Sequence, residues 1–277
     1  MSNRLKVMIM VSIMAVAVSV ITVVVILLEP CQYCGSKFCN GDCVIIYNNE
    51  NRFFDKTDTL EKKNKTNQKT TRILETEMAD DNYLDSLVFI GDSRTIGLKA
   101  FANLSDDNVF AEDGLNHEAA LTKEIVPIQE FKNVTIVDAV KLRAPDIMVV
   151  SLGINGAVWL SVDNFMEGYS EFIKEMESAS PSSVIVISAI TPVAMFYENK
   201  EDGVSNEKID EINLALYEYA KNNGYYYLAL DENLKDENND LPDEYHNGDG
   251  LHYNKKAYEV IVDYLNTHQI YKKRGIL

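Results

Sequence analysis

The stretch Leu87-Val88-Phe89-Ile90-Gly91-Asp92-Ser93 joins a short apolar run to a Gly-Asp-Ser turn. The apolar residues have the character of a buried strand, and residues 95–101 are compatible with a helix. Ser93 is therefore predicted to lie where a strand ends and a helix begins. Backbone N–H groups and the helix dipole favour negative charge at such a position. A nucleophilic hydroxyl and a developing oxyanion would both be favoured there.

Segments of strand character alternate with segments of helical character from residue 87 onward. Strands are predicted at residues 87–90, 109–111, 147–152, 184–190 and 225–230. Helices are predicted at residues 134–143, after Ser161, and around residues 209–219 and 257–264. This alternation predicts an α/β fold with a parallel sheet that is covered on both faces. Functional sites in such folds form beyond the carboxyl ends of the strands.

A second candidate catalytic motif precedes the last predicted helix. Its residues are Asp249-Gly250-Leu251-His252. A serine hydroxyl is a weak nucleophile until a base removes its proton, and that base needs an acid to orient it. A spacing of three residues in a loop can bring the Asp249 and His252 side chains to one side. The sequence therefore predicts a serine esterase site with Ser93 as nucleophile, His252 as base and Asp249 as orienting acid.

The oxyanion of such a reaction also needs hydrogen-bond donors. Gly114 follows the second predicted strand and can offer its backbone N–H close to a ligand, because it has no side chain. Asn155 follows the third predicted strand and can offer its side-chain amide, while the Ser93 N–H is a third donor. Each residue alone also has a purely structural interpretation, with Ser93 as a helix N-cap and Asn155 as a turn residue. Their order along the chain favours catalysis.

This order of short blocks resembles the SGNH (GDSL-type) hydrolase family over about residues 83–265. The blocks are, in order, Gly91-Asp92-Ser93, then Gly114, then Gly153 with Asn155, and finally Asp249 with His252. Gly156 stands where an Asp often follows the Asn of the third block. The resemblance implies a flavodoxin-like three-layer α/β/α fold and hydrolysis of esters through an acyl-serine, without a metal or other cofactor. Some similar proteins transfer or remove acetyl groups on carbohydrates.

Several other residues have two interpretations. His246, Asp249 and His252 are spaced by threes and are an alternative set of metal ligands, although the glycines between them disfavour a regular helix. His117 is either a pocket residue or an ordinary surface histidine. Arg94 either contacts substrate or pairs with an acid. Residues 195–197, Met-Phe-Tyr, form either a pocket wall or loop packing.

The N-terminal part of the chain predicts a membrane anchor. Residues 7–28 are an uncharged run without Gly or Pro, long enough to cross a bilayer as a helix. Arg4 and Lys6 precede this run, so the positive-inside rule places residues 1–6 in the cytoplasm and the remainder outside the cell. A cleaved signal peptide is the alternative. Residues 47–82 are polar and predict a linker, which leaves residues 83–277 for the hydrolase domain.

All four cysteines, Cys31, Cys34, Cys39 and Cys43, fall within the juxtamembrane residues 29–46. In an extracellular segment the natural prediction is two disulfides, with three possible pairings. A metal site is the first alternative, and free or lipid-modified thiols are the second.

A formal net charge of −17 excludes nucleic acid as an expected partner, because phosphate binding requires clustered Lys and Arg. We expect a single-pass protein of the cell membrane whose extracellular domain hydrolyses short-chain esters. O-acetyl groups on cell-envelope carbohydrate are the expected substrate. A non-catalytic surface-binding domain of the same fold and an O-acyltransferase are the alternatives.

Overall fold

The computed structural model describes residues 70–129, 132–198 and 204–271. The predicted cytoplasmic tail, the membrane anchor, the cysteine-rich segment and residues 47–69 of the linker lie outside the described residues. The chain divides into two compact units, Met1–Asn64 and Lys65–Leu277, and the second contains all of the described residues. Within the described ranges, no helix combines the length and the apolar character needed to span a bilayer.

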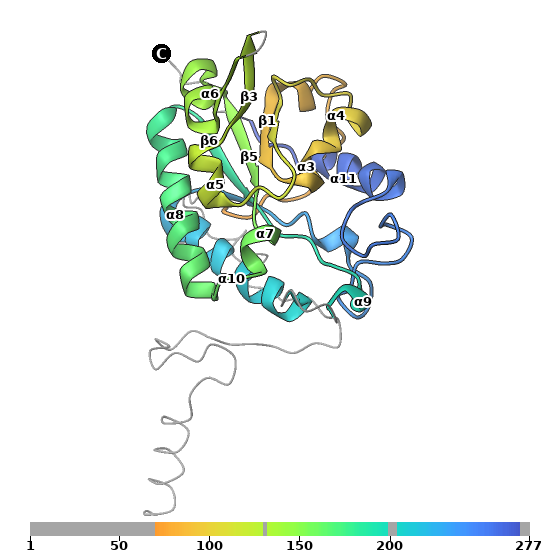
Figure 1. The fold of residues 1–277 in the computed structure, drawn as a ribbon. Coiled ribbons are helices and arrows are strands. Elements are labelled where there is room, and N and C mark those ends of the chain that lie inside the picture. The colour runs from red at the N-terminus through yellow and green to blue at the C-terminus, as the bar shows by residue number, and fades with distance from the viewer. Residues whose placement is uncertain (1–69, 130–131, 199–203, 272–277) are drawn as a thin grey trace, which may run out of the picture. The chain divides into compact units, whose positions relative to one another are not determined.

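A five-stranded parallel sheet forms the centre of the second unit (Figure 1). Its strand order is β2-β1-β5-β6-β7, and every neighbouring pair is parallel. The strands are β1 (Leu87–Gly91), β2 (Val109–Ala111), β5 (Ile147–Ser151), β6 (Val184–Ser188) and β7 (Tyr226–Leu228). The first strand, β1, takes the second position in the sheet. The second strand is added on one side of it and all later strands on the other, as in flavodoxin-like folds. This confirms the predicted parallel α/β fold.

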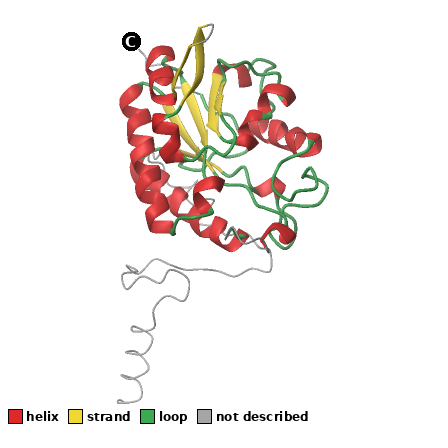
Figure 2. Cartoon of the chain, in the orientation of Figure 1, coloured by secondary structure: helices red, strands yellow, loops and turns green. Residues whose placement is uncertain are grey.

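Helices cover both faces of the sheet and give the fold its three layers (Figure 2). One face carries α5 (His117–Thr122), α6 (Ile136–Arg143), α8 (Val162–Ala179) and α10 (Asn206–Asn223). The other carries α3 (Ser93–Ile96), α4 (Leu98–Phe101) and α11 (Lys255–Thr267). Each face has its own apolar core, one centred on Phe165 and Met176 of α8 and the other on Ile261 and Leu265 of α11. Two such cores explain why the central strands are apolar along their whole length.

Short elements occupy the connections between these layers. They are α7 (Ile154–Ala157), α9 (Met195–Glu198) and the 3-10 turns η2 (Leu84–Ser86) and η3 (Glu232–Leu234). Side-chain caps fix where the longer helices begin: the Ser161 hydroxyl accepts from Asn164 N at 3.3 Å, and the Asn254 side chain accepts from Lys256 N at 2.9 Å.

A β-hairpin occupies residues for which the sequence analysis predicted no strand. It pairs β3 (Glu124–Gln129) with β4 (Lys132–Thr135) in antiparallel fashion. Consequently the helix predicted at residues 134–143 begins only at Ile136, where the Thr135 side chain caps it by accepting from Asp138 N at 3.1 Å. Pro127 lies within β3 and weakens the strand signal, because proline cannot donate to a sheet ladder.

Residues 71–79, which belong to the predicted linker, pack against the domain. Ile73 N donates to Tyr227 O at 2.9 Å and Tyr227 N donates to Thr71 O at 2.8 Å, so this segment runs along the edge of β7. Ile73 is buried in the core beneath α11. The polar composition of residues 70–82 concealed this packing, since the segment gains its order only from a strand partner distant in sequence.

Candidate active site

The turn that follows β1 places Ser93 at the carboxyl edge of the sheet. All five β1 residues are buried, and Gly91 pairs with Ser151 at the end of β5. A Cβ on Gly91 would lie 1.8 Å from Thr95 Oγ1, so only glycine allows the chain to turn back so tightly into α3. Asp92 caps α3 by accepting from Arg94 N at 3.0 Å. The nucleophile candidate therefore starts a helix directly after a buried strand.

A chain of hydrogen bonds joins Ser93 to the loop before α11. His252 Nε2 lies 3.1 Å from Ser93 Oγ, and His252 Nδ1 lies 2.6 Å from Asp249 Oδ2. Asp249 Oδ1 accepts from the backbone N–H groups of Leu251 and His252, both at 2.8 Å. Partial burial raises the pKa of the Asp249 carboxyl, but these hydrogen bonds outweigh it and bring the pKa to about 2. The ionised carboxylate accepts from Nδ1–H, which leaves Nε2 free to accept the Ser93 proton.

The loop that carries Asp249 and His252 is shaped by His246. Its Nδ1 accepts from Gly248 N at 2.9 Å and lies 3.4 Å from Gly250 N, while its Nε2 faces Asp243 Oδ1 at 3.3 Å. Both glycines adopt left-handed backbone angles, φ 97° and φ 79°, which let the loop curl around the imidazole. Across the described part of the chain, no three His, Cys, Asp or Glu side chains form a group that could hold a metal ion.

The Asn155 amide, at the start of α7, connects two of the predicted blocks. Its Nδ2 donates to Leu115 O at 3.0 Å and lies 3.5 Å from Asp92 Oδ2. The amide is thus held beside the Ser93 turn. Gly114 immediately precedes Leu115, has φ 71° and has open space where a Cβ would stand. Its neighbour Leu115, whose carbonyl accepts from the Asn155 amide, connects this stretch of the chain to the site.

Asp92 is buried next to Ser93, and its carboxyl is unusual for that reason. Burial raises the pKa of Asp92 to about 6, although the nearby Arg94 charge and the hydrogen bond from Arg94 N lower it. The sequence analysis treated Asp92 only as part of the Gly-Asp-Ser turn. The structure shows that the Asp92 carboxylate caps α3 and also lies beside the Asn155 amide, so it contacts two parts of the site.

The Arg94 side chain makes a set of hydrogen bonds that the sequence analysis did not predict. Its guanidinium is buried and donates to neutral oxygens: Nε to Leu251 O at 3.0 Å, Nη1 to Thr191 O at 2.8 Å and to Thr191 Oγ1 at 2.7 Å, and Nη2 to Pro192 O at 3.0 Å. Among the residues described it forms no ion pair with a carboxylate, although its charge lowers the pKa of the neighbouring Asp92.

His117 is also placed differently from both of its predicted interpretations. The side chain is fully buried, edge-on to the Phe165 ring at 4.9 Å and to the Tyr169 ring at 6.0 Å between centroids. Residues 195–197 form part of α9, where Phe196 lies edge-on to His246 with 5.4 Å between centroids. Phe196 thus supports the loop of Asp249 and His252 while staying about half exposed.

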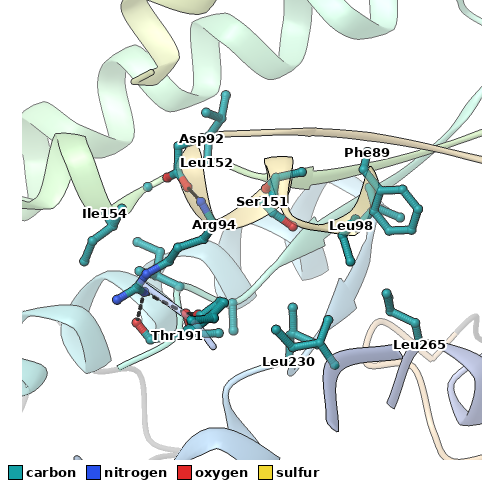
Figure 3. Close-up of a pocket in the computed structure, with 17 residues that line it drawn as sticks. Phe89, Asp92, Arg94, Leu98, Ser151, Leu152, Ile154, Thr191, Leu230 and Leu265 are labelled. Atoms are coloured by element: carbon teal, nitrogen blue, oxygen red, sulfur yellow. Dashed lines mark hydrogen bonds between the residues drawn. The ribbon is translucent and has the colours of Figure 1, made fainter. Parts of the chain in front are cut away.

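A cavity of about 40 Å³ lies beside the Ser93 turn, between the sheet and α11 (Figure 3). Asp92, Arg94 and Thr191 form its polar wall, and Phe89, Leu98, Leu230 and Leu265 are among its apolar residues. Ser93 does not line it. The cavity belongs to the core that supports the nucleophile turn, and its contribution to the site is indirect.

Comparison with known proteins gives similar solved structures and one matching protein family. Among solved structures, a Streptococcus pneumonia protein assigned provisionally as a platelet activating factor is 20% identical, over 69% of this chain and 83% of that chain, with a TM-score of 0.50. A GDSL-like lipase from Bacteroides thetaiotaomicron is 16% identical over 63% and 82% of the two chains, with a TM-score of 0.46. A carbohydrate esterase of family 3 from Talaromyces cellulolyticus is 14% identical over 64% and 94%, with a TM-score of 0.45. No curated protein matches the sequence significantly.

The sequence itself matches the GDSL-like lipase/acylhydrolase family over residues 89–260. This range begins within β1, ahead of Ser93, and ends within α11, beyond His252, so it contains the whole hydrogen-bonded chain from Ser93 to Asp249. Because the match covers more than half of the sequence, the chain belongs to the GDSL-like lipase/acylhydrolase family, and this membership indicates hydrolase activity of the esterase class.

Proposed function

We propose that the protein is a serine esterase in which Ser93, His252 and Asp249 carry the reaction. The observation on which this proposal rests is the continuous hydrogen-bonded chain from Ser93 Oγ through His252, with 3.1 Å at Nε2 and 2.6 Å at Nδ1, to the Asp249 carboxylate. A base within this distance of a hydroxyl, itself oriented by an ionised acid, is the arrangement that activates a serine.

The reaction proceeds in two halves. Ser93 Oγ attacks the ester carbonyl carbon while His252 Nε2 takes the hydroxyl proton, and the protonated imidazole then gives that proton to the departing alkoxide. In the second half, His252 removes a proton from water as the water oxygen attacks the acyl-serine. The proton returns to Ser93 Oγ as the carboxylic acid leaves. Asp249 remains ionised throughout and stabilises the imidazolium.

The oxyanion that forms in each half requires donors beside Ser93. We assign this role to the backbone N–H groups of Ser93 and Gly114 and to the Asn155 amide. The amide donates one N–H to Leu115 O at 3.0 Å, and its second N–H, which makes only a 3.5 Å contact with Asp92 Oδ2, turns to the oxyanion as charge develops. The position of Ser93 at the beginning of α3 also favours negative charge, although a helix this short contributes mainly its local N–H groups.

We further propose that the substrate is a short-chain ester, such as an O-acetyl group, on carbohydrate of the cell envelope. The apolar run of residues 7–28 and the basic residues before it support an extracellular domain tethered to the membrane. The side chains of His252 and Asp249 are 45% and 43% exposed, so a bulky polymer can approach them. An open site of this kind suits an ester that projects from a large acceptor.

The proposal is tested by measuring turnover of p-nitrophenyl acetate, butyrate and octanoate by the full-length protein. We expect the acetate ester to be hydrolysed fastest, activity to persist in the presence of a chelator, and Ser93→Ala to abolish turnover. Asp249→Asn should lower kcat by about 10⁴-fold, because the neutral amide favours the wrong imidazole tautomer. Ser170→Ala, on the distant helix α8, is the matched control and should retain full activity.

Other outcomes distinguish the alternatives. A folded wild-type protein without turnover supports the non-catalytic binding domain. Loss of activity with chelator supports metal-dependent hydrolysis. Appearance of acetylated product in place of acetate, when an oligosaccharide acceptor is supplied, supports acyl transfer.

A further inference from the structure

The side chain of Arg94 links the nucleophile turn to two loops that are distant in the sequence. Arg94 directly follows Ser93, and its Nε donates to the carbonyl of Leu251, the residue before His252, at 3.0 Å. Its two terminal nitrogens donate to the carbonyls of Thr191 and Pro192, which follow β6. One side chain therefore ties together the segments that carry the serine, the histidine and the β6–α9 connection; Figure 3 shows the part of this arrangement in which Arg94 contacts Thr191.

The cost of burying a guanidinium makes a simple packing role a poor explanation. Only 8% of the Arg94 surface is exposed, and its hydrogen-bond acceptors are neutral oxygens. Removing a cation from water costs several kcal/mol, and apolar residues of similar volume often give equal or greater stability. Five N–H donors in a rigid planar fork do, however, hold several carbonyls in one geometry, which an apolar side chain cannot do.

Two tyrosines from the segment after His252 also contact Arg94. Its guanidinium lies 5.0 Å from the centre of the Tyr253 ring, and its own carbonyl accepts from Tyr258 Oη at 2.9 Å. Thr191, which accepts from Nη1, also hydrogen-bonds to the Tyr253 hydroxyl. Both tyrosines belong to the segment immediately after His252. The backbone on both sides of the Ser93–His252 contact is thus anchored to this one residue.

We propose that Arg94 is a positioning residue that sets the distance between Ser93 Oγ and His252 Nε2 by joining the nucleophile turn to the histidine loop. The inference rests on the proposed serine mechanism. Ser93 and His252 are 159 positions apart in the chain, and their 3.1 Å contact is a single bond between two partly exposed side chains. The partly buried bond from Arg94 to Leu251 joins the same two segments, one residue away from Ser93 and one from His252. Misplacement of catalytic groups by about 1 Å can cost about 100-fold in rate.

The test uses the full-length protein with Arg94→Met, which keeps the apolar part of the side chain and removes its donors. We expect kcat for p-nitrophenyl acetate to fall about 100-fold with KM unchanged, because the Arg94 side chain is buried and a loss of alignment affects the transition state rather than substrate binding. Labelling of Ser93 by a fluorophosphonate should slow to the same extent. Methylguanidinium added to Arg94→Ala should restore part of both rates.

Arg143→Met is the matched control. Arg143 also donates to backbone carbonyls, of Asp106 at 3.2 Å and of Pro127 at 3.0 Å, and its guanidinium also lies over an aromatic ring, 4.9 Å from the centre of Phe110. It does so on α6, away from Ser93. We expect Arg143→Met to reduce thermal stability without changing kcat or the labelling rate.

Each remaining outcome contradicts either the positioning role of Arg94 or the serine mechanism on which it rests. Wild-type kcat in folded Arg94→Met overturns the positioning role, and a rise in KM at constant kcat indicates substrate contact instead. If Arg94→Met does not fold, Arg94→Lys decides. A single ammonium nitrogen does not reproduce the planar fork whose three nitrogens reach Leu251 O, Thr191 O and Pro192 O, so a folded Lys variant with wild-type kcat contradicts the proposal. If neither variant folds, Arg94 is required for folding and the proposal fails. Absence of turnover and labelling in the wild type would instead refute the serine mechanism.

Discussion

Asp92 and Arg94 flank Ser93, and both are buried, but their charges are accommodated in different ways. Arg94 has a neutral acceptor for each of its three nitrogens. The Arg94 charge, one backbone N–H at 3.0 Å and the more distant Asn155 amide at 3.5 Å only partly compensate an ionised Asp92 carboxylate. The raised pKa of Asp92, about 6, is the consequence of this incomplete compensation for burial.

Asp92→Asn should therefore stabilise the protein above pH 6 while lowering its activity. In the unfolded chain this carboxyl has a pKa of about 3.9, so between pH 4 and 6 the folded state binds the proton more readily. The free energy of unfolding is therefore highest, with respect to this carboxyl, below pH 4. It falls as the pH rises from 4 to 6 and stays lower above pH 6. At pH 7 the cost is on the order of 3 kcal/mol, which a neutral Asn avoids.

Thermal unfolding of both proteins at pH 4, 5, 6 and 7 checks this expectation. The melting temperature of Asp92→Asn should exceed that of the wild type at pH 7 and approach it at pH 4. Activity should fall, because the new amide group would present a donor, in place of an acceptor, to Asn155. A difference in melting temperature that does not change with pH would contradict the pKa argument.

At the scale of elements, α5 and α8 meet through an unusual contact between a buried histidine and a glycine. A Cβ on Gly168 of α8 would lie 2.8 Å from His117 Nε2. Neither ring nitrogen of His117 has a hydrogen-bond partner among the described residues, and burial lowers the pKa of this imidazole, which keeps it neutral. The ring is fixed between aromatic neighbours and cannot easily move away from the glycine.

Gly168→Ala is consequently expected to destabilise the protein by about 1–3 kcal/mol, as overpacking does. In a His117→Ala background the same change should be neutral or stabilising by up to about 1 kcal/mol, because alanine is the better helix former. Urea unfolding of the two single variants and the double variant measures this coupling. Stabilisation by Gly168→Ala in the otherwise unchanged protein would contradict the account of the α5–α8 contact.

Most elements could be predicted from the sequence because their signals are local. The strands at residues 87–90 and 147–152 are continuous apolar runs, and the Ser161 cap with its apolar stripe identified α8. The hairpin of β3 and β4 could not be predicted, since Pro127 obscures it and its strands are stabilised mainly by pairing with each other. His117 lies on a helix of only six residues, too short for a periodic pattern to show which side is buried.

The site shows the same division between local and distant information. The order and spacing of Ser93, Asp249 and His252 are readable in short motifs, and the structure brings these three side chains into one hydrogen-bonded chain. The connections of Arg94 could not be predicted, because its partners are mostly backbone carbonyls, which every residue possesses. Such contacts depend on the path of the backbone, and they do not require a particular residue type at the accepting position.

At the scale of the whole molecule, residues 70–82 join the domain to the preceding part of the chain. Besides the backbone pairing of Thr71 and Ile73 with Tyr227, Thr76 N donates to Thr267 O at 2.6 Å and Ala79 N donates to Asn266 O at 2.9 Å. Arg72 forms an ion pair with Glu232. The segment therefore covers the edge strand β7 and the end of α11.

A fragment that begins at Tyr83 should be markedly less stable than one that begins at Lys65. It exposes the edge of β7 and loses Ile73, whose buried side chain alone is worth about 2–5 kcal/mol on truncation to alanine. The midpoints of thermal unfolding of the two fragments provide the measurement. Equal midpoints would show that residues 70–82 contribute nothing to the stability of the fold.

The central claim, that Ser93 is an activated nucleophile, is tested most directly by treating the purified full-length protein with a fluorophosphonate and locating the adduct by mass spectrometry. The account predicts a single adduct on the peptide that contains Ser93, absent from Ser93→Ala and strongly reduced in His252→Ala. A folded protein that remains unmodified, or that is modified only at another residue while hydrolysing esters, would contradict it.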